Sequence, residues 1–430
     1  MRNLGLFLLS FAFLCQAQQD PGPHAGSPSA GHPLLTLTPN ERTAFATGKT
    51  TFQEVDSVSG TLASGSGLGP RFNADSCASC HAFPDIGGSS PALNPQIAVA
   101  SKAGALNAIP AFLSATGPVR IARFVKDSQG KPDGGVHDLF VISGRTDAPG
   151  CNIAQPDFAA AAAAGNLALR IPTPLFGAGL IEAIEDGAIL LNKVADLTQK
   201  VGLGIAGHEN RNANDGSLTR FGWKAQNKSL LIFAGEAYNV EQGVTNDVFP
   251  QERDSTPGCR FNATPEDHLN VNNSTLDGAS GDLAKFVMFM RFLAPPSRTM
   301  TINPDPGEAT FRNIGCALCH TPSFVTATNT TAALSNKQLN LFSDLLVHKM
   351  GQALQDGISQ GDAQGDEFRT APLWGLSQRL FLLHDGRATD LKEAIAAHSS
   401  PGSEANGVIA NYNSLTAAQK QDLLRFLRTL

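Results

Sequence analysis

One five-residue motif occurs twice in this 430-residue chain and constrains its fold more than any other feature. The pattern C-x-x-C-H is present at residues 77–81 and again at residues 316–320. In this pattern two thiols attach to the vinyl groups of one porphyrin, and the adjacent histidine binds the iron as its proximal ligand. We therefore expect two covalently bound c-type haems, with His81 and His320 as proximal ligands. The attachment residues are Cys77, Cys80, Cys316 and Cys319.

Zinc binding and dithiol chemistry are the alternatives for these cysteine pairs. Two C-x-x-C pairs can form a zinc site with four thiolate ligands or act as redox dithiols. Zinc ribbons separate their two pairs by roughly 15–20 residues. Here more than two hundred residues lie between the pairs, and a histidine directly follows each one. The spacing favours haem.

The N-terminus has the pattern of a secretory signal peptide, which we assign to residues 1–17. Arg2 precedes a mostly apolar run at residues 4–14, and the small residue Ala17 offers a cleavage site. The apolar run is too short to span a bilayer, and no other segment is long and apolar enough, so we expect no membrane span. Because covalent haem is normally attached after export, we expect the bacterial periplasm. A lipoprotein anchored through Cys15 is the weaker alternative.

Two cysteines remain once Cys15 and the haem cysteines are set aside. Cys151 and Cys259 each follow a Pro-Gly pair. In an oxidising compartment such a pair favours a structural disulfide, and two reactive thiols are the alternative. Closing a loop of this size stabilises a fold by roughly 4–5 kcal/mol on the chain-entropy model.

The charge balance of the chain argues against nucleic-acid binding. The formal net charge is −6, and no run rich in lysine or arginine is present. A nucleic-acid-binding protein instead carries a basic patch or stripe. We therefore expect no nucleic-acid partner.

Helix signals divide the chain into two expected domains. Residues 18–36 are rich in Pro, Gly, Ser and His and are expected to be disordered. The first domain, residues 37–295, opens at a capping box that starts at Thr38 and closes with a helix, because apolar residues recur at helical spacing over 283–293. Two prolines then end that helix.

The second domain, residues 296–430, repeats this plan on a smaller scale. Asp305 and the following proline offer a helix start just before the second haem motif, and a capping box at Thr416 opens the final helix. A cytochrome c domain is built this way, with crossing first and last helices. We therefore expect a mainly α fold of two cytochrome c-like domains. About 200 residues follow the first haem motif before its closing helix, against about 95 in the second half, so the first domain is enlarged by a long loop-rich insertion.

Several further motifs resemble the bacterial di-haem oxidoreductase (peroxidase-like) family. They lie, in consistent order, at residues 67–73, 220–225, 243–245, 343–351, 369–376 and 384–388. The family is similar to di-haem cytochrome c peroxidases and to the tryptophan-modifying enzymes related to them. The resemblance implies one electron-transfer haem, one reactive haem, an aromatic bridge between them and often a calcium ion nearby.

The sixth ligand of the second haem is expected to be His398. A capping box at Asp390 starts a helix on which Leu391, Ile395 and His398 share one face. The resembled peroxidases bind their electron-transfer haem at this point, usually through methionine. A core histidine bonded to a carbonyl is the plain alternative, and Met350 is the alternative ligand.

The remaining histidines and methionines are weaker candidates. For the first haem no permanent distal ligand stands out, and His137 is the only loop histidine that we nominate. His348 and His384 lie in family motifs and are expected to contact propionates or backbone. The methionines of the closing helix, Met288 and Met290, are expected to pack in the core.

The resemblance also implies the catalytic residues. The segment 223–245 resembles the peroxidatic segment of the related enzymes, and Glu241 falls where their acid–base carboxylate lies; Glu236 is the competing position. Trp223 is the expected bridge for electron transfer between the haems, and Trp374 is expected to flank the second haem. This chain departs from the family at Phe233, near which a glutamine is common.

The function expected from the resemblance is peroxide reduction at the N-terminal haem, with electrons entering through the C-terminal haem. A small periplasmic cytochrome c or copper protein would be the donor, and hydrogen peroxide the oxidant. A non-catalytic di-haem electron carrier, or a haem oxidase or oxygenase with another substrate, are the alternatives, because a shared fold does not determine the chemistry of a site.

Overall fold

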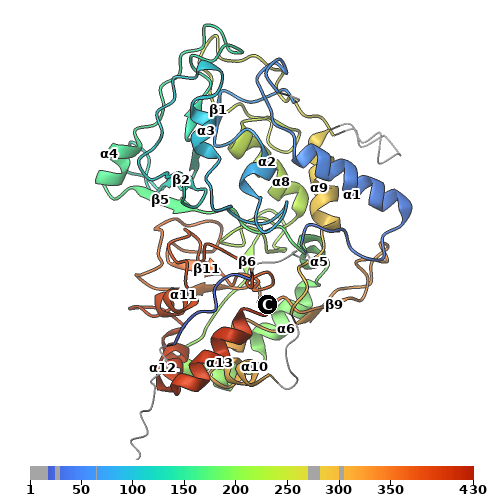
Figure 1. Ribbon diagram of the computed structural model, residues 1–430, viewed down its shortest axis with the longest axis vertical. Helices are drawn as coiled ribbons and strands as arrows, with labels where there is room; N and C mark the ends of the chain where they lie inside the picture. The colour runs from blue at the N-terminus through green and yellow to red at the C-terminus, as the bar shows by residue number, and fades with distance from the viewer. Residues whose placement is uncertain (1–17, 25–29, 64, 270–280, 300–304) are drawn as a thin grey trace, which may run out of the picture.

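The computed structural model of the protein describes residues 18–24, 30–63, 65–269, 281–299 and 305–430 (Figure 1). The predicted signal peptide, residues 1–17, lies outside these ranges. Helices make up 29 % of the chain, which is no more than the roughly 30–35 % of an average globular protein. The expectation of a mainly α chain is therefore met only in part, because turns and loops dominate. Within the described ranges no helix is long and apolar enough to cross a membrane.

The helices are short, and most lie in the first 300 residues. Those of this part are α1 (Pro39–Phe52), α2 (Cys77–Cys80), α3 (Gln96–Ala100), η1 (Lys102–Gly104), α4 (Phe158–Ala163), α5 (Ala178–Glu182), α6 (Asp186–Val194), α7 (Leu197–Leu203), α8 (Leu230–Gln242) and α9 (Asp282–Phe292). Those that follow are α10 (Pro306–Asn313), η3 (Cys316–Leu318), α11 (Leu391–Ala397), α12 (Asn406–Ser414) and α13 (Ala417–Leu427).

The strands form small antiparallel sheets. The three-stranded sheet has the order β3 (Val136–His137), β2 (Ile121–Phe124), β5 (Leu167–Arg170). The two-stranded sheets are β1 (Arg71–Phe72) with β4 (Phe140–Val141), β6 (Asn210–Arg211) with β7 (Leu218–Thr219), β8 (Phe324–Val325) with β9 (Gln338–Leu339), and β10 (Val347–Lys349) with β11 (Glu367–Arg369).

The helix starts predicted at Thr38, Asp305 and Thr416 are confirmed. At Asp390 the side chain caps α11 by accepting from the amide of Lys392, without the predicted reciprocal box. Thr38 and Glu41 form a reciprocal capping box at α1, and Thr416 and Gln419 form another at α13. The Asp305 side chain accepts hydrogen bonds from the first amides of α10, whose first residue is a proline. These starts depend on local hydrogen bonds, which is why the sequence alone reveals them.

In each half the opening helix packs closely on the closing helix. α1 contacts α9, and α10 contacts α13 (Figure 1). Both contacts require a glycine: a Cβ on Gly48 of α1 would lie 2.2 Å from the Lys285 carbonyl oxygen, and one on Gly307 of α10 would lie 2.2 Å from that of Asp422. The expected contact between first and last helices is therefore present twice.

Part of the long insertion packs on the second half of the chain. Ile205, just after α7, belongs to the apolar cluster that contains Phe311 of α10 and Leu424 of α13. In Figure 1 the green helix α6 lies in the lower part of the molecule with α10 and α13. The amide of Ala206 donates to Glu404. The environment of the second haem motif is thus built from segments on both sides of the expected boundary at residue 295.

The segment after the predicted signal peptide is packed, which corrects the expectation of disorder over the described residues 18–24 and 30–36. Asp20 is buried and forms a bidentate ion pair with the buried Arg428, the C-cap residue of α13. Its carboxylate also accepts from the amide of Leu391, the first residue of α11. Composition predicted disorder because these partners lie about 370 to 410 residues away. Leu37 and Ala30 are likewise buried in the main core.

The predicted disulfide is present in the structure. Cys151 and Cys259 are joined, 108 residues apart in sequence. Both cysteines are buried in an apolar cluster with Phe140 of β4 and Phe158 of α4. The bond therefore closes the loop-rich insertion around its own small core.

Candidate functional site

The first C-x-x-C-H motif opens onto a cavity, which we call the first cavity. Cys77, Cys80 and His81 all line it, together with residues from α8, β2 and β5. The His81 Nδ1–H donates to the carbonyl of Gly88 (3.0 Å), so Nε2 is left without the proton and is able to bind a metal. Burial lowers the pKa of His81 to about 4, which keeps the ring neutral.

The second motif opens onto another cavity, which we call the second cavity. Cys316, Cys319 and His320 line it. The His320 Nδ1–H donates to the carbonyl of Phe342 (3.1 Å), and burial lowers its pKa to about 4. Each motif therefore presents two thiols and one oriented neutral imidazole to a cavity.

The donor sets of both cavities fit a haem. Apolar side chains make up much of each wall, as a porphyrin requires, and all four motif cysteines are free thiols. Two guanidinium groups on the second cavity, Arg369 and Arg379, have no carboxylate partner among the described residues; burial lowers the pKa of each to about 10, so both stay charged. They suit the anionic propionates of a haem.

Glu241 faces the first cavity from the end of α8. Its backbone carbonyl accepts from the amides of Asn73 and Ala74, which ties this helix end to the segment just before the first haem motif. Burial and the nearby charge of Glu236 raise the pKa of Glu241 to about 7, against the opposing charge of Arg123. A carboxyl group with this pKa exchanges protons near neutral pH.

Glu236, the competing carboxylate, also lines the first cavity but is already bonded. It accepts a hydrogen bond from Asn227 Nδ2 at 2.5 Å. The Glu241 carboxylate accepts none from the part of the chain that the structure describes. Of the two, Glu241 is therefore the freer to bind a ligand.

Trp223 lies between the two cavities and lines both. Its indole Nε1–H donates to the carbonyl of Ile171 (2.9 Å), and its own carbonyl accepts from the amide of Arg369 (2.8 Å). Its ring centroid is 6.4 Å from that of His384, on the second cavity. Trp374, expected beside the second haem, lines a third, smaller cavity together with Trp223, and is not among the residues described around the second cavity.

The structure brings His398 and Met350 to the second cavity, together with His320. The His398 Nδ1–H donates to the carbonyl of Ala394 (2.7 Å), which leaves Nε2 without a proton and able to bind iron. His398 is therefore bonded to a backbone carbonyl, as the plain alternative states, and it also lines the cavity, as a haem ligand must. His398 also lowers the pKa of His320 through its charge, after the larger effect of burial, so the two rings are close.

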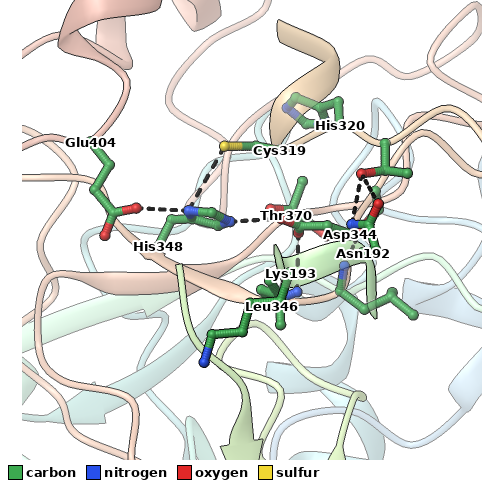
Figure 2. A network of polar contacts seen from close by, with 12 residues as sticks. Asn192, Lys193, Cys319, His320, Asp344, Leu346, His348, Thr370 and Glu404 are labelled. Atoms are coloured by element: carbon green, nitrogen blue, oxygen red, sulfur yellow. Dashed lines mark hydrogen bonds and ion pairs between the residues drawn. The ribbon is translucent and has the colours of Figure 1, made fainter. Parts of the chain in front are cut away.

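His348 is bonded to carboxylate side chains. Figure 2 shows its ring between two carboxylates: Nδ1 lies 2.8 Å from Glu404, and Nε2 lies 2.9 Å from Asp344. Cys319, Asp344 and His348 lie near enough to share a metal ion, but Cys319 belongs to the haem attachment motif. Both ring nitrogens are engaged by carboxylates of the described chain and not by its backbone, and the expected contact with a haem propionate stays a prediction.

The other candidates differ in their position relative to the cavities, and His384 lines the second cavity. His384 stacks on Phe368, with ring centroids 4.2 Å apart. His137 is paired with Asp133 and stacked on Phe124, and it is not among the residues described around the first cavity. Met290 lines the first cavity from α9. His137 is therefore no distal ligand in this arrangement.

Sequence reasoning missed the cavity arginines. Arg123 and Arg170 stand on neighbouring strands, β2 and β5, whose register places them on one face, and both line the first cavity. Arg123 interrupts the apolar run 121–125, and a charged residue inside such a run was the available signal. A lone charge in a short strand does not show which cavity it faces.

Comparison with known proteins places the chain in a family. Residues 155–430 match the family described as "Di-haem oxidoreductase, putative peroxidase". No match was found among curated proteins. Two solved structures show weak similarity. One is hydrazine synthase of Kuenenia stuttgartiensis pressurised with xenon, at 12% identity and a TM-score of 0.37 over 100% of both chains. The other is a MauG-like protein associated with microbial copper homeostasis, at 19% identity and a TM-score of 0.30, over 60% of this chain and 90% of that one.

The family match covers well over half of the chain, and includes the second haem motif, Glu241 and His398. The first haem motif lies outside it but has the same geometry as the second. Family membership and the two cavities agree on two haems and on electron-transfer chemistry. The chain belongs to the di-haem oxidoreductase family.

Proposed function

We propose that the protein is an exported c-type di-haem oxidoreductase that reduces peroxide. The reactive haem is held in the first cavity, through Cys77, Cys80 and His81. The electron-accepting haem is held in the second, with His398 as its distal ligand. Two cytochrome c-like domains, covalent attachment, the periplasmic location and a calcium ion are parts of this proposal.

The proposal rests on a difference between the two cavities in the side chains that could bind iron or exchange a proton. His81 is the only histidine described on the first cavity, where the Glu241 carboxylate is without a hydrogen-bond partner in the described chain. Four histidines and Met350 line the second cavity. A cavity that offers further histidine and methionine side chains beside its proximal histidine suits a six-coordinate electron-transfer haem. A cavity with an unbonded carboxylate suits a haem that binds substrate.

A haem bound in the first cavity supplies an iron centre where peroxide binds and receives electrons. The protein supplies the proton transfers. Glu241 would take a proton from one oxygen of peroxide and return it to the other oxygen, which leaves as water. A pKa of about 7 suits both transfers, because neither form of the carboxyl group is strongly favoured near neutral pH.

Trp223 is the proposed electron bridge. It is the only tryptophan that lines both haem cavities among the described residues, and hydrogen bonds to Ile171 and from Arg369 fix its position. The electrons come from a small periplasmic cytochrome c or copper protein. A Trp223→Phe variant should keep both haems but slow electron transfer between them, measured by flash reduction of the second haem. An unchanged rate would remove Trp223 from the path.

The two carboxylates of the first cavity provide a matched test. Glu241→Gln should lower the rate of peroxide consumption by about 10²- to 10⁴-fold, the usual contribution of a general acid–base group, while Glu236→Gln should change it by much less. Haem absorption and melting temperature serve as controls for folding. Full activity in Glu241→Gln would contradict the proposal, and loss of activity only in Glu236→Gln would assign the role to Glu236.

A further inference from the structure

Arg123 is a buried cation on the wall of the first cavity. It lies in β2, with 6% of its surface exposed, on the same face of the sheet as Arg170. Burial, followed by repulsion from Arg170, lowers the pKa of Arg123 to about 10. This value is far above neutral pH, so the guanidinium group stays charged at the pH of the periplasm.

Two nitrogens of this guanidinium group are unused. Nη1 donates to the carbonyl of Gly134 (2.7 Å), whereas Nη2 and the buried Nε have no hydrogen-bond partner in the described chain. Arg170, its neighbour, differs: Nε and Nη2 donate to Asp356 and Nη1 donates to Gln360. A buried charged donor left unpaired is costly to a fold, so an acceptor bound in the cavity would relieve that cost.

The surroundings of Arg123 suit a ligand that gains negative charge. Glu236 and Glu241 act on it electrostatically, and Arg170 and Arg253 repel it. Phe233 lines the same cavity and offers no donor. The cavity therefore combines a proton-exchanging carboxyl group with a guanidinium group that has unpaired donors.

We infer that Arg123 is the hydrogen-bond donor that binds the peroxide, or an inorganic anion in its place, beside Glu241. This inference rests on the proposed function. When the O–O bond breaks, the bonding electron pair goes to the leaving oxygen, which takes the proton from Glu241 and departs as water. Overall, peroxide, two protons and two electrons from the donor protein give two waters. Arg123 stabilises the charge that develops on the leaving oxygen.

Fluoride binding to the oxidised holoprotein tests this assignment without turnover. Fluoride is a small anion that accepts hydrogen bonds, and its affinity is read from the haem absorption spectrum. Losing a charged hydrogen bond of this kind should weaken binding by about 10- to 100-fold in Arg123→Gln. Arg120→Gln is the matched control, because the Arg120 side chain donates to the carbonyls of Asp385 and Phe112 and is not among the residues described around the first cavity. Its affinity should stay within about twofold of the wild type.

Each outcome decides the question. If Arg123→Gln does not fold, Arg123→Lys keeps the charge but not the guanidinium donors, and should still bind fluoride at least threefold more weakly. Unchanged affinity in the folded variant, or no fluoride binding by the wild type, would overturn the assignment. If fluoride binding depends on Arg123 but the wild type does not react with peroxide, the proposed function fails and the anion site stands. If the wild type reacts and the affinity is unchanged, only the role of Arg123 fails.

Discussion

Replacing Asp20 with asparagine should destabilise the protein far more than its place near the N-terminus suggests. The Asp20 and Arg428 side chains are 4% and 0% exposed, and two hydrogen bonds of 2.8 and 2.7 Å join them. Removing one partner of a buried ion pair leaves the other charge unpaired and costs about 3–5 kcal/mol. We therefore expect Asp20→Asn to lose about 3 kcal/mol or more of unfolding free energy.

Further variants separate the contributions of this contact. Asp20→Ala also loses the hydrogen bond to the Leu391 amide at the start of α11, which adds about 1 kcal/mol. Combining Asp20→Asn with Arg428→Met removes both charges, so the double variant should be more stable than the sum of the single effects predicts. Arg425→Ala is the control: this exposed residue of α13 lies three positions before Arg428 and should change stability by less than about 0.5 kcal/mol.

Urea unfolding followed by circular dichroism, with midpoint and slope compared among the variants, measures these differences. The pH dependence gives a second check. Burial would raise the pKa of Asp20, but hydrogen bonds from Arg428, Leu391 and Gly22 outweigh it and hold the pKa below its ordinary value. The pair therefore stabilises the fold above the pKa of the unfolded chain, and this part is lost as pH falls through the folded pKa. A loss below about 1 kcal/mol in Asp20→Asn would refute the reasoning.

The haem sites and the disulfide give three more predictions. Peroxide consumption should rise with pH through about 7, because Glu241 must be ionised to accept a proton; a Glu241→Gln profile that keeps this rise would contradict it. His398→Ala should convert the second haem from low to high spin in EPR, whereas Met350→Leu should not; the reverse result would make Met350 the ligand. Serine at both Cys151 and Cys259 should lower stability to urea by roughly 4–5 kcal/mol on the chain-entropy model, and an unchanged midpoint would contradict it.

Features that depend on neighbouring residues could be predicted from the sequence. The C-x-x-C-H spacing alone defines which thiols and which imidazole meet one cavity, and the capping boxes at Thr38 and Thr416 define two helix starts. Pairing of Cys151 with Cys259 followed from counting cysteines. The resemblance placed Glu241 and Trp223, and the structure brings both to the first cavity.

Features that depend on distant contacts could not be predicted. The segment at residues 18–24 reads as disordered because its composition cannot reveal the salt bridge of Asp20 with Arg428. Arg123 was not recognised as a site residue, since its place on the cavity wall depends on the register of β2 with β5. His348 sits between two carboxylates that come from different parts of the chain, 4 and 56 residues away.

The most direct test of the central claim is the reaction of the half-reduced protein with peroxide. EPR and absorption spectra of the protein, with the second haem reduced, should show one haem that is high-spin or becomes so, and that changes within milliseconds of adding hydrogen peroxide. The same sample should consume peroxide when a reduced cytochrome c is supplied. Two six-coordinate haems that stay inert to peroxide would contradict the account and leave the protein an electron carrier.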